Sequence, residues 1–346
     1  MKTLSSPLFL LLILLTIIMI IPAQANPGLA LTAKTDKQEY YTKDSVYIYG
    51  NLSLDGILVT DGLVGLQIQN SQDQLLTIRT LLTGTLPPTT PYVKLWYVVP
   101  CNSSGEPQTS FKIGTLGYFK ISVTNYDIES REVLMTINTY YPDNTPFGFA
   151  SIRTTLSGQS ESTFIISIPI PKDAVLGTAY AYANVYTDWP KNGGTPYGNE
   201  EKGIFTIVSS GTLSQTTQEF NTLETGDTGN FNLTLRLPRK TPYGNCTVYV
   251  TSRYLGESIF NSTTFKVYIL GDLGGGLPPA FFAFDGQVTG ADLALFIRCY
   301  KGLAPPEAMY LGDLGGGLPP AFFAFDGQVT GADLALFIRC YKGLGP

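Results

Sequence analysis

The chain of 346 residues contains no histidine. This absence excludes catalysis by a Ser-His-Asp triad or a Cys-His pair, and it removes the commonest zinc ligand. Charged residues are also scarce, at 14% of the chain with a formal net charge of −5. No basic patch is therefore present to neutralise the phosphates of a nucleic acid. A metal ion bound by this chain would have to lie among oxygen ligands.

The abundant residue types are aromatic or turn-forming. The chain has 21 tyrosines, 19 phenylalanines, 36 glycines and 23 prolines, a composition typical of an all-β extracellular protein. From Leu29 to about Tyr268, short strand-like runs alternate with turn residues, and no long helical period occurs. We therefore expect a mainly β fold.

The N-terminus predicts export. Lys2 precedes the apolar run Leu8–Ile21, and residues 22–25 (PAQA) end in a small-residue cleavage pattern, so residues 1–25 are expected to be a signal peptide. The alternative is an uncleaved anchor, for which the apolar run is short. We expect an extracellular or cell-surface protein with no stable membrane span after cleavage.

The spacing of the predicted strands indicates two or three tandem β-sandwiches. A Ser/Thr-rich stretch, Ser209–Thr217, is the expected boundary before the last of them. The predicted domains are a first sandwich, a second, a short third and a C-terminal module, over residues 26–128, 129–208, 209–269 and 270–346.

The first predicted strands carry a family resemblance. Residues 37–40 (KQEY), followed by residues 46–50 (VYIYG) after a tight turn, resemble the opening of macroglobulin-like and other immunoglobulin-like surface domains. The resemblance implies immunoglobulin-like sandwiches. It implies little about function, because such sandwiches support many functions.

The C-terminal module is an exact duplication. Residues 270–303 and 311–344 have the same sequence, joined by the connector Ala304–Tyr310. Two identical units cannot supply the different groups that the two halves of one active site need. The duplication therefore predicts a binding or pairing module.

Each copy contains a candidate calcium loop. Asp285 and Gly286 fit loop positions five and six, Gln287 offers its backbone carbonyl, and Thr289 and Asp292 supply later oxygens. Asp272 is the candidate first ligand. The second copy repeats the set with Asp313, Asp326, Gln328, Thr330 and Asp333. The alternative is that Thr289 and Asp292 only cap a helix and that the Asp-Gly pair only forms a turn.

The module resembles a dockerin, a pair of tandem EF-hand-like repeats. The resemblance rests on Gly271-Asp272, on residues 285–288 (DGQV), and on residues 292–296 (DLALF). It implies calcium ligands at Asp272, Asp285, Thr289 and Asp292 and their copies, and a cohesin-like or other surface protein as partner. The ten residues 275–284 (GGLPPAFFAF) are an insert that departs from the family pattern. This chain also lacks the Asn or Asp that the family has at loop position three.

A short amphipathic helix is predicted over Asp292–Lys301, with an apolar face that one copy is too small to bury. The two copies are therefore expected to pack together. Four basic residues remain on the outside and, by the dockerin resemblance, are candidate partner contacts: Arg298, Lys301, Arg339 and Lys342.

Two further candidates come from the rest of the chain. Cys299 and Cys340 occupy the same position in the two copies and could form a disulfide, with free buried thiols as the alternative. A loop between two predicted strands combines aromatic and acidic residues that could bind a sugar or calcium, and the alternative is a packed structural loop. Its candidate residues are Asp188, Trp189, Tyr197 and Glu200.

The sequence as a whole predicts an exported, non-enzymatic, modular surface protein. Its dockerin-like repeats would bind calcium and attach the chain to another protein. One alternative is a carbohydrate-binding adhesin that uses loops of the sandwiches. Another is an accessory subunit of a polysaccharide-degrading complex. No catalytic residue is predicted, because one loop offers no second wall for an active site.

Overall fold

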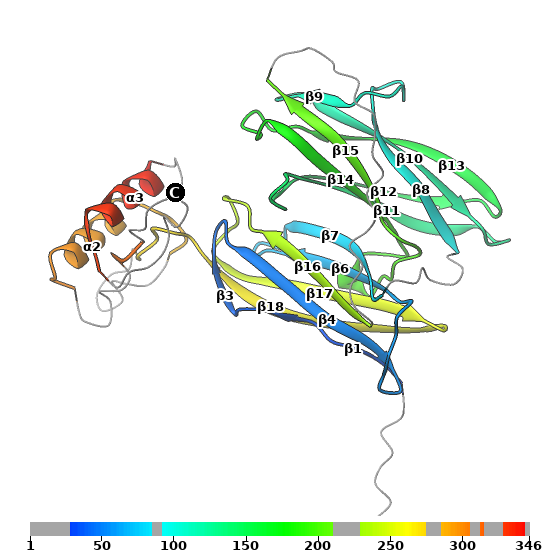
Figure 1. Ribbon diagram of the computed structural model, residues 1–346, viewed down its shortest axis with the longest axis horizontal. Helices are drawn as coiled ribbons and strands as arrows, with labels where there is room; N and C mark the ends of the chain where they lie inside the picture. Colours follow the sequence, from blue (N-terminus) through cyan, green and yellow to red (C-terminus); the bar gives the residue numbers. More distant parts are fainter. Residues whose placement is uncertain are drawn as a thin grey trace, which may run out of the picture.

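The computed structural model describes residues 28–84, 92–209, 229–274, 285–304, 312–314 and 328–342. In these residues the chain is mainly β, as predicted, with two short α-helices near the C-terminus (Figure 1). The predicted signal peptide, the insert at residues 275–284 and Asp326 lie outside the described residues. No helix of the described part is both long and apolar enough to cross a membrane.

The first β unit, here called the split unit, is built from two separate parts of the chain. One sheet has the order β1-β4-β16, with β2 and β5 also paired to β4. The other has the order β3-β18-β17-β6-β7, in which only the β3–β18 pair is parallel. The strands are β1 (Leu29–Leu31), β2 (Lys34–Thr35), β3 (Glu39–Tyr41), β4 (Ser45–Leu54), β5 (Ile57–Leu58), β6 (Leu63–Gln69), β7 (Leu75–Leu82), β16 (Asn230–Arg236), β17 (Gly244–Tyr254) and β18 (Glu257–Tyr268).

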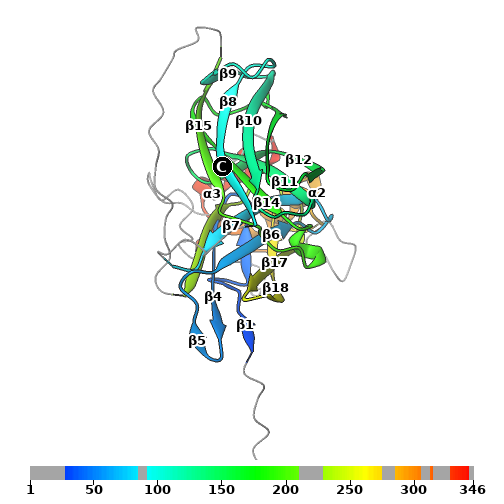
Figure 2. The ribbon, with the colours of Figure 1, turned by 90° about the vertical axis from the view of Figure 1, so that its right-hand side faces the viewer.

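The second β unit, here called the inserted unit, lies between β7 and β16 in the sequence. A sheet of order β13-β10-β8 packs on a sheet of order β12-β11-β14-β15-β9. The strands are β8 (Val93–Cys101), β9 (Ser110–Lys112), β10 (Leu116–Asn125), β11 (Arg131–Tyr140), β12 (Pro146–Leu156), β13 (Ser160–Pro169), β14 (Gly177–Tyr186) and β15 (Glu201–Val208). Figures 1 and 2 both show the inserted unit above the split unit, with β9 at the top and β1 at the bottom.

Each unit has its own apolar core between its two sheets. In the split unit, alternating residues of β4 such as Val46 and Ile48 are fully buried against residues of β6 and β17. In the inserted unit, Phe111, Phe119 and Phe205 meet edge to face, with ring centroids 5.3 to 5.6 Å apart. The period-2 pattern of the sequence thus places one face of each strand in a core.

The predicted division into three consecutive sandwiches is wrong. Strands β16 and β17 pair with β4 and β6, with Phe231 opposite Gly50 and Val248 opposite Ile68, so residues 230–268 complete the first unit. Strands β8 to β10, predicted to belong to the first sandwich, pack with β11 to β15 instead. Alternation in a sequence identifies which face of a strand is buried, but it does not identify the partner strand.

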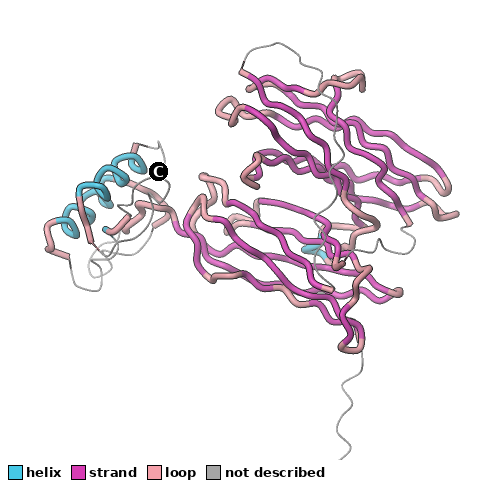
Figure 3. The backbone as a smooth tube through the Cα atoms, in the orientation of Figure 1, coloured by secondary structure: helices cyan, strands magenta, loops and turns pink. Residues whose placement is uncertain are grey.

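The two C-terminal helices form a third unit, here called the helical unit. Helix α2 (Gly290–Tyr300) and helix α3 (Gly331–Tyr341) confirm the predicted helix in each copy. They pack on each other through Phe296 and Phe337, which are both fully buried with ring centroids 5.0 Å apart. Figure 3 shows both helices beside the split unit, close to the end of the strand that leads into them.

Candidate functional site

The two repeats of the helical unit pack reciprocally. A Cβ atom placed on Gly271 of the first copy would lie 3.1 Å from the Cβ of Cys340 in the second. A Cβ on Gly312 of the second copy would lie 2.6 Å from the Cβ of Cys299 in the first. Glycine permits this close approach because it has no side chain. The Gly-Asp opening of each repeat therefore rests on the helix of the other.

This packing explains why the predicted disulfide is absent. Cys299 and Cys340 are both free thiols. Each faces the glycine of the other repeat, while Phe296 and Phe337 occupy the contact between the helices. Burial raises the pKa of both thiols. Symmetry-related positions meet only at the axis that relates the copies, and the cysteines do not lie there. The alternative of buried free thiols is the correct one for Cys299, and Cys340 is half-buried.

The Asp292 carboxylate joins the helix start to the opening of its own repeat. Its Oδ2 accepts the backbone N–H of Thr289 at 2.6 Å, and the Thr289 hydroxyl accepts the N–H of Ala291, which makes a capping box. Its Oδ1 accepts the N–H groups of Leu273 and Gly274 at 2.8 and 3.0 Å. The predicted capping role is confirmed for both residues.

The second repeat has the same arrangement. Asp333 accepts from the N–H of Leu314 at 2.7 Å and from the N–H of Thr330 at 2.6 Å, and Thr330 caps α3 in the same way. Asp313 is buried, and Gln328 is exposed before the helix.

Asp272 is a buried carboxylate that accepts backbone N–H groups. Its Oδ2 lies 2.7 Å from the nitrogen of Gly286, and its Oδ1 lies 3.3 Å from that of Asp285. Burial raises its pKa to about 6, and the negative charges of Asp292 and Asp285 act in the same direction. Asp285 itself forms a turn by accepting the N–H of Gln287 at 2.9 Å. Negative charge thus accumulates in the first repeat without an ion pair to a described lysine or arginine.

These carboxylates do not form a coordination shell among the described residues, which hold no cluster of three metal-binding side chains. The oxygens of Asp272 and Asp292 accept backbone N–H groups instead. The backbone nitrogen of Asp285 lies 3.3 Å from Asp272 Oδ1, and the Thr289 hydroxyl lies 3.0 Å from Asp292 Oδ2, so both residues add further oxygens nearby. The chemistry of this donor set suits a hard cation such as calcium.

The outer surface of the helical unit is duplicated. The four predicted basic residues are all exposed: Arg298, Lys301, Arg339 and Lys342. Apolar and aromatic side chains accompany them in each copy. Ile297 and Ile338 are both 39% exposed, and Tyr300 and Tyr341 are 48% and 47% exposed.

The predicted ligand loop belongs to the inserted unit and contacts the split unit. Glu200 is buried, and both its carboxylate oxygens pair with Arg79 of β7, with Nη2–Oε1 at 2.5 Å and Nε–Oε2 at 2.9 Å. Trp189 precedes the short 3-10 helix η1 (Pro190–Asn192) and packs on Phe149, with ring centroids 5.9 Å apart. Asp188 pairs with Arg153.

These contacts favour the alternative of a packed structural loop for Asp188, Trp189 and Glu200. The Glu200 carboxylate accepts hydrogen bonds from Arg79 and from the backbone N–H of Thr80, which leaves ligand binding by Glu200 without support. Tyr197 differs from the other three, because it lines a groove between the units.

The sequence did not predict the cluster around Arg79. Its guanidinium lies 3.5 Å from the ring centroid of Tyr182 and 5.4 Å from that of Tyr140. Burial alone would lower the pKa of Arg79, but the Glu200 carboxylate outweighs burial and the pKa is raised. The Tyr186 hydroxyl donates to the Arg79 carbonyl at 2.6 Å. The only local signal was an arginine within the apolar strand β7, because its partners lie far along the chain.

Comparisons with known proteins assign no family. No family model matches the chain, and no curated protein matches it. Several solved structures are weakly similar. The alkylpurine DNA glycosylase AlkC of Pseudomonas fluorescens is 8% identical, over 35% of this chain and 32% of that chain, with a TM-score of 0.26.

Two smaller proteins match over most of their own length. The C-terminal domain of Wzt is 13% identical, over 38% of this chain and 86% of that chain, with a TM-score of 0.29. A CARDB domain from Pyrococcus furiosus in complex with di-metal ions is 12% identical, over 35% of this chain and 99% of that chain, with a TM-score of 0.25. At these TM-scores the similarities carry no functional argument.

Proposed function

We propose that this chain is an exported, non-enzymatic surface protein, attached to another protein by its helical unit in the manner of the dockerins it resembles. The observation that carries the proposal is the duplicated outer surface of α2 and α3. In this proposal the two β units are immunoglobulin-like sandwiches that form the body of the protein.

The composition of that surface supports protein binding. Each copy exposes an isoleucine and a tyrosine beside two basic residues, and tyrosine and arginine are enriched where protein interfaces hold most of their binding energy. Because the helices are anchored by buried Phe296 and Phe337, the surface is held in place before a partner arrives. A partner with an apolar centre and an acidic rim, such as a cohesin-like or other surface protein, fits this chemistry.

The test is capture of a cohesin-like domain by the full-length mature chain, compared between charge-reversal variants. Arg298→Glu/Lys301→Glu changes the first copy, and Arg339→Glu/Lys342→Glu changes the second. If either copy can bind, each pair of changes weakens capture about twofold and all four abolish it. A matched control, Lys34→Glu/Lys172→Glu, changes exposed lysines of the β units. Capture that survives all four changes would rule out this surface.

We further propose that calcium binds each repeat. The proposed ligands of the first copy are Asp272, Asp285, Thr289, Asp292 and the carbonyl of Gln287, and those of the second are Asp313, Asp326, Thr330, Asp333 and the carbonyl of Gln328. The unneutralised negative charge around Asp272 supports this, because a bound cation would offset it.

Calorimetric titration of the full chain with calcium tests this second proposal. We expect saturable binding that Asp285→Ala/Asp326→Ala removes, and a helical unit that melts at lower temperature in chelator. A melting curve that chelator leaves unchanged would show that the carboxylates only accept backbone hydrogen bonds.

A further inference from the structure

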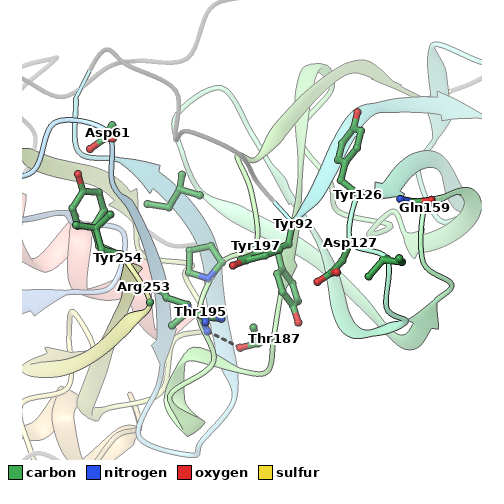
Figure 4. A pocket seen from close by; sticks show the side chains of 15 residues that line it. Asp61, Tyr92, Tyr126, Asp127, Gln159, Thr187, Thr195, Tyr197, Arg253 and Tyr254 are labelled. Atoms are coloured by element: carbon green, nitrogen blue, oxygen red, sulfur yellow. Dashed lines mark hydrogen bonds between the residues drawn. The ribbon is translucent and has the colours of Figure 1, made fainter.

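A groove of about 960 Å³ lies between the split unit and the inserted unit (Figure 4). One wall comes from the split unit, through Asp61, Arg253, Tyr254 and Leu255. The other comes from the inserted unit and includes Tyr92, Tyr126, Asp127, Gln159 and Tyr197. The loop that carries Tyr197 therefore has the second wall that the sequence did not reveal.

Aromatic rings line both walls, and several of them remain open to solvent. Tyr92 and Tyr126 are 48% and 50% exposed. Figure 4 shows Tyr92 and Tyr197 at the centre of the groove, with Tyr254 toward one end and Tyr126 toward the other. Rings of this size are usually packed into a core or an interface. Their arrangement along one groove offers flat apolar faces to a ligand.

The Tyr92 ring is held in place by both units. The guanidinium of Arg131 from β11 lies 4.4 Å from its centroid, and that of Arg253 from β17 lies 5.9 Å away. The backbone carbonyl of Tyr92 also accepts the N–H of Tyr126 at 2.8 Å. These two cations fix the orientation of the ring, which nevertheless stays 48% exposed. The tyrosine is therefore a preformed platform.

The polar groups of the groove carry charges of both signs. Asp127 pairs with Arg131, with Nε–Oδ2 at 2.7 Å, and this contact lowers the pKa of Asp127. Asp61 interacts with the hydroxyl of Tyr254. Arg253 is exposed and makes no ion pair with a described carboxylate. The charged residues that line the groove are Asp61, Asp127 and Arg253. Arg131 lies beside the groove as the partner of Asp127, and with it these four charges sum to zero.

The walls are also fixed relative to each other. The buried Arg79–Glu200 pair joins the units, and the Thr251 hydroxyl donates to the Gly194 carbonyl at 2.7 Å from β17 to the loop of the inserted unit. A ligand therefore meets a groove that is already formed, and binding requires little ordering of the protein.

We infer that this groove binds a neutral oligosaccharide. A pyranose ring has an apolar face of C–H groups that packs flat on a tyrosine, and hydroxyl groups that bond to carboxylate, amide and guanidinium groups. Both kinds of partner line this groove. An acyl chain would need an apolar enclosure, whereas Asp61, Asp127 and Arg253 place charged groups in this groove. An anionic polymer would need a net positive charge, which is absent.

An extended peptide fits the groove less well. Peptides that bind as an added strand need a free sheet edge for their main-chain hydrogen bonds. Arg253 and Tyr254 end β17, which is paired with β18 along its length and with β6 as far as Ser252. The β11 strand that carries Arg131 is paired with β12 along its length and with β14 from Leu134 onward. The groove therefore offers side chains and only two or three residues of free edge on each strand.

The experiment uses the full mature chain and calorimetric titration with four neutral hexaoses: cellohexaose, mannohexaose, xylohexaose and maltohexaose. Hexagalacturonate serves as the acidic comparison and an unstructured hexapeptide as the peptide comparison. We expect at least one neutral hexaose to bind. Tyr92→Ala should weaken that binding by about tenfold, whereas Tyr92→Phe, which keeps the ring, should weaken it far less.

The matched control is Tyr47→Ala. Tyr47 is 41% exposed and stacks with Tyr49 on β4, outside the groove, so its loss should leave affinity unchanged. The inference is overturned if none of the four neutral hexaoses binds, if only hexagalacturonate or the peptide binds, or if Tyr92→Ala and Tyr47→Ala have equal effects. Because the groove does not involve the helical unit, removing calcium or changing Arg298 should not alter the result.

Discussion

The molecule contains two internal junctions that are held together by opposite means. The split and inserted units meet at a buried polar cluster, where Arg79 pairs with Glu200 and lies over Tyr182. The two helical repeats meet at an apolar contact, where Phe296 stacks on Phe337. The first junction joins different residues that lie far apart in the sequence. The second joins identical residues to each other.

This difference shows what each kind of contact contributes. Apolar contacts stabilise by burial and tolerate small shifts, whereas a buried ion pair is satisfied in few geometries. The polar junction is therefore suited to fixing the angle between the β units, on which the width of the groove depends. The apolar junction is suited to holding two small repeats that have little core of their own. The following changes test this comparison.

The largest effect is expected at the polar junction. Arg79→Ala should lower the free energy of unfolding by about 3–5 kcal/mol, because it leaves the Glu200 carboxylate buried without its cation. Chemical denaturation of the full chain measures this. Arg79→Met/Glu200→Gln removes both charges and should recover much of the loss. A loss below about 1 kcal/mol for Arg79→Ala would show that the pair is not strongly desolvated.

At the apolar junction, Phe296→Ala and Phe337→Ala should each destabilise the helical unit by about 3 kcal/mol, because each removes a fully buried ring. The two effects should be equal, since the rings contact each other across the junction. Hydrogen exchange of the α2 and α3 amides measures the stability of the helical unit separately from that of the β units. Clearly unequal effects would show that one repeat depends more on its neighbours than the other.

The reciprocal packing is tested by Gly312→Ala, which should cost about 2 kcal/mol because its Cβ would lie 2.6 Å from that of Cys299. Gly331→Ala is the matched control, since a Cβ there meets nothing within 4 Å. Hydrogen exchange of α2 should change for the first variant only. Equal exchange in both would contradict the close approach of the two repeats.

The charge around Asp272 predicts a pH dependence. Its pKa is raised from 3.8 to about 6 in the folded chain, so the folded state holds this proton more tightly than the unfolded state. The free energy of unfolding of the helical unit should therefore fall, by about 2 kcal/mol, as pH rises from about 4 to about 6. Thermal melting in chelator between pH 4 and pH 8 measures this.

Asp272→Asn is the control for that titration, because it should flatten the pH profile. Under the calcium proposal, added calcium should also restore stability above pH 6 in the unmodified chain. A profile with the opposite slope would show that hydrogen bonds to the ionised carboxylate dominate over burial.

The smallest effect is expected from an exposed ion pair that also joins the two β units. Arg236 of β16 pairs with Asp143 at 2.7 Å, and both side chains are more than 40% exposed. Arg236→Gln should change the free energy of unfolding by less than about 0.5 kcal/mol, because water and salt screen exposed pairs. Denaturation at low and high salt checks it. An effect similar to that of Arg79→Ala would remove the distinction between buried and exposed contacts.

Local features of this fold could be read from the sequence, and long-range ones could not. Thr289 and Asp292 predict the start of α2, because a capping box involves residues only three apart in the sequence. The alternation of apolar and polar residues in β4 likewise predicts which face of the strand is buried. The pairing of β16 with β4 was missed because nothing local in residues 230–236 specifies a partner on the other side of a whole unit.

The candidate sites divide in the same way. The four basic residues in the last turns and C-caps of α2 and α3 are exposed, as the helical period predicts. The groove was missed except for Tyr197, because Tyr92, Arg253 and Tyr254 come from segments that only the fold brings together. The disulfide between Cys299 and Cys340 was predicted wrongly, because equivalent positions in two copies of a repeat need not contact each other.

The insertion of one unit into the other sets an order of folding. The inserted unit consists of consecutive strands, and its sheets are complete once β15 has been synthesised. The split unit cannot complete either of its sheets until β16, β17 and β18 have followed. Strands β4 and β6 therefore wait with unpaired edges while the later unit folds, and an exposed edge can pair with another chain. The strands from β1 to β7 are synthesised first, and they therefore need protection from aggregation for longest.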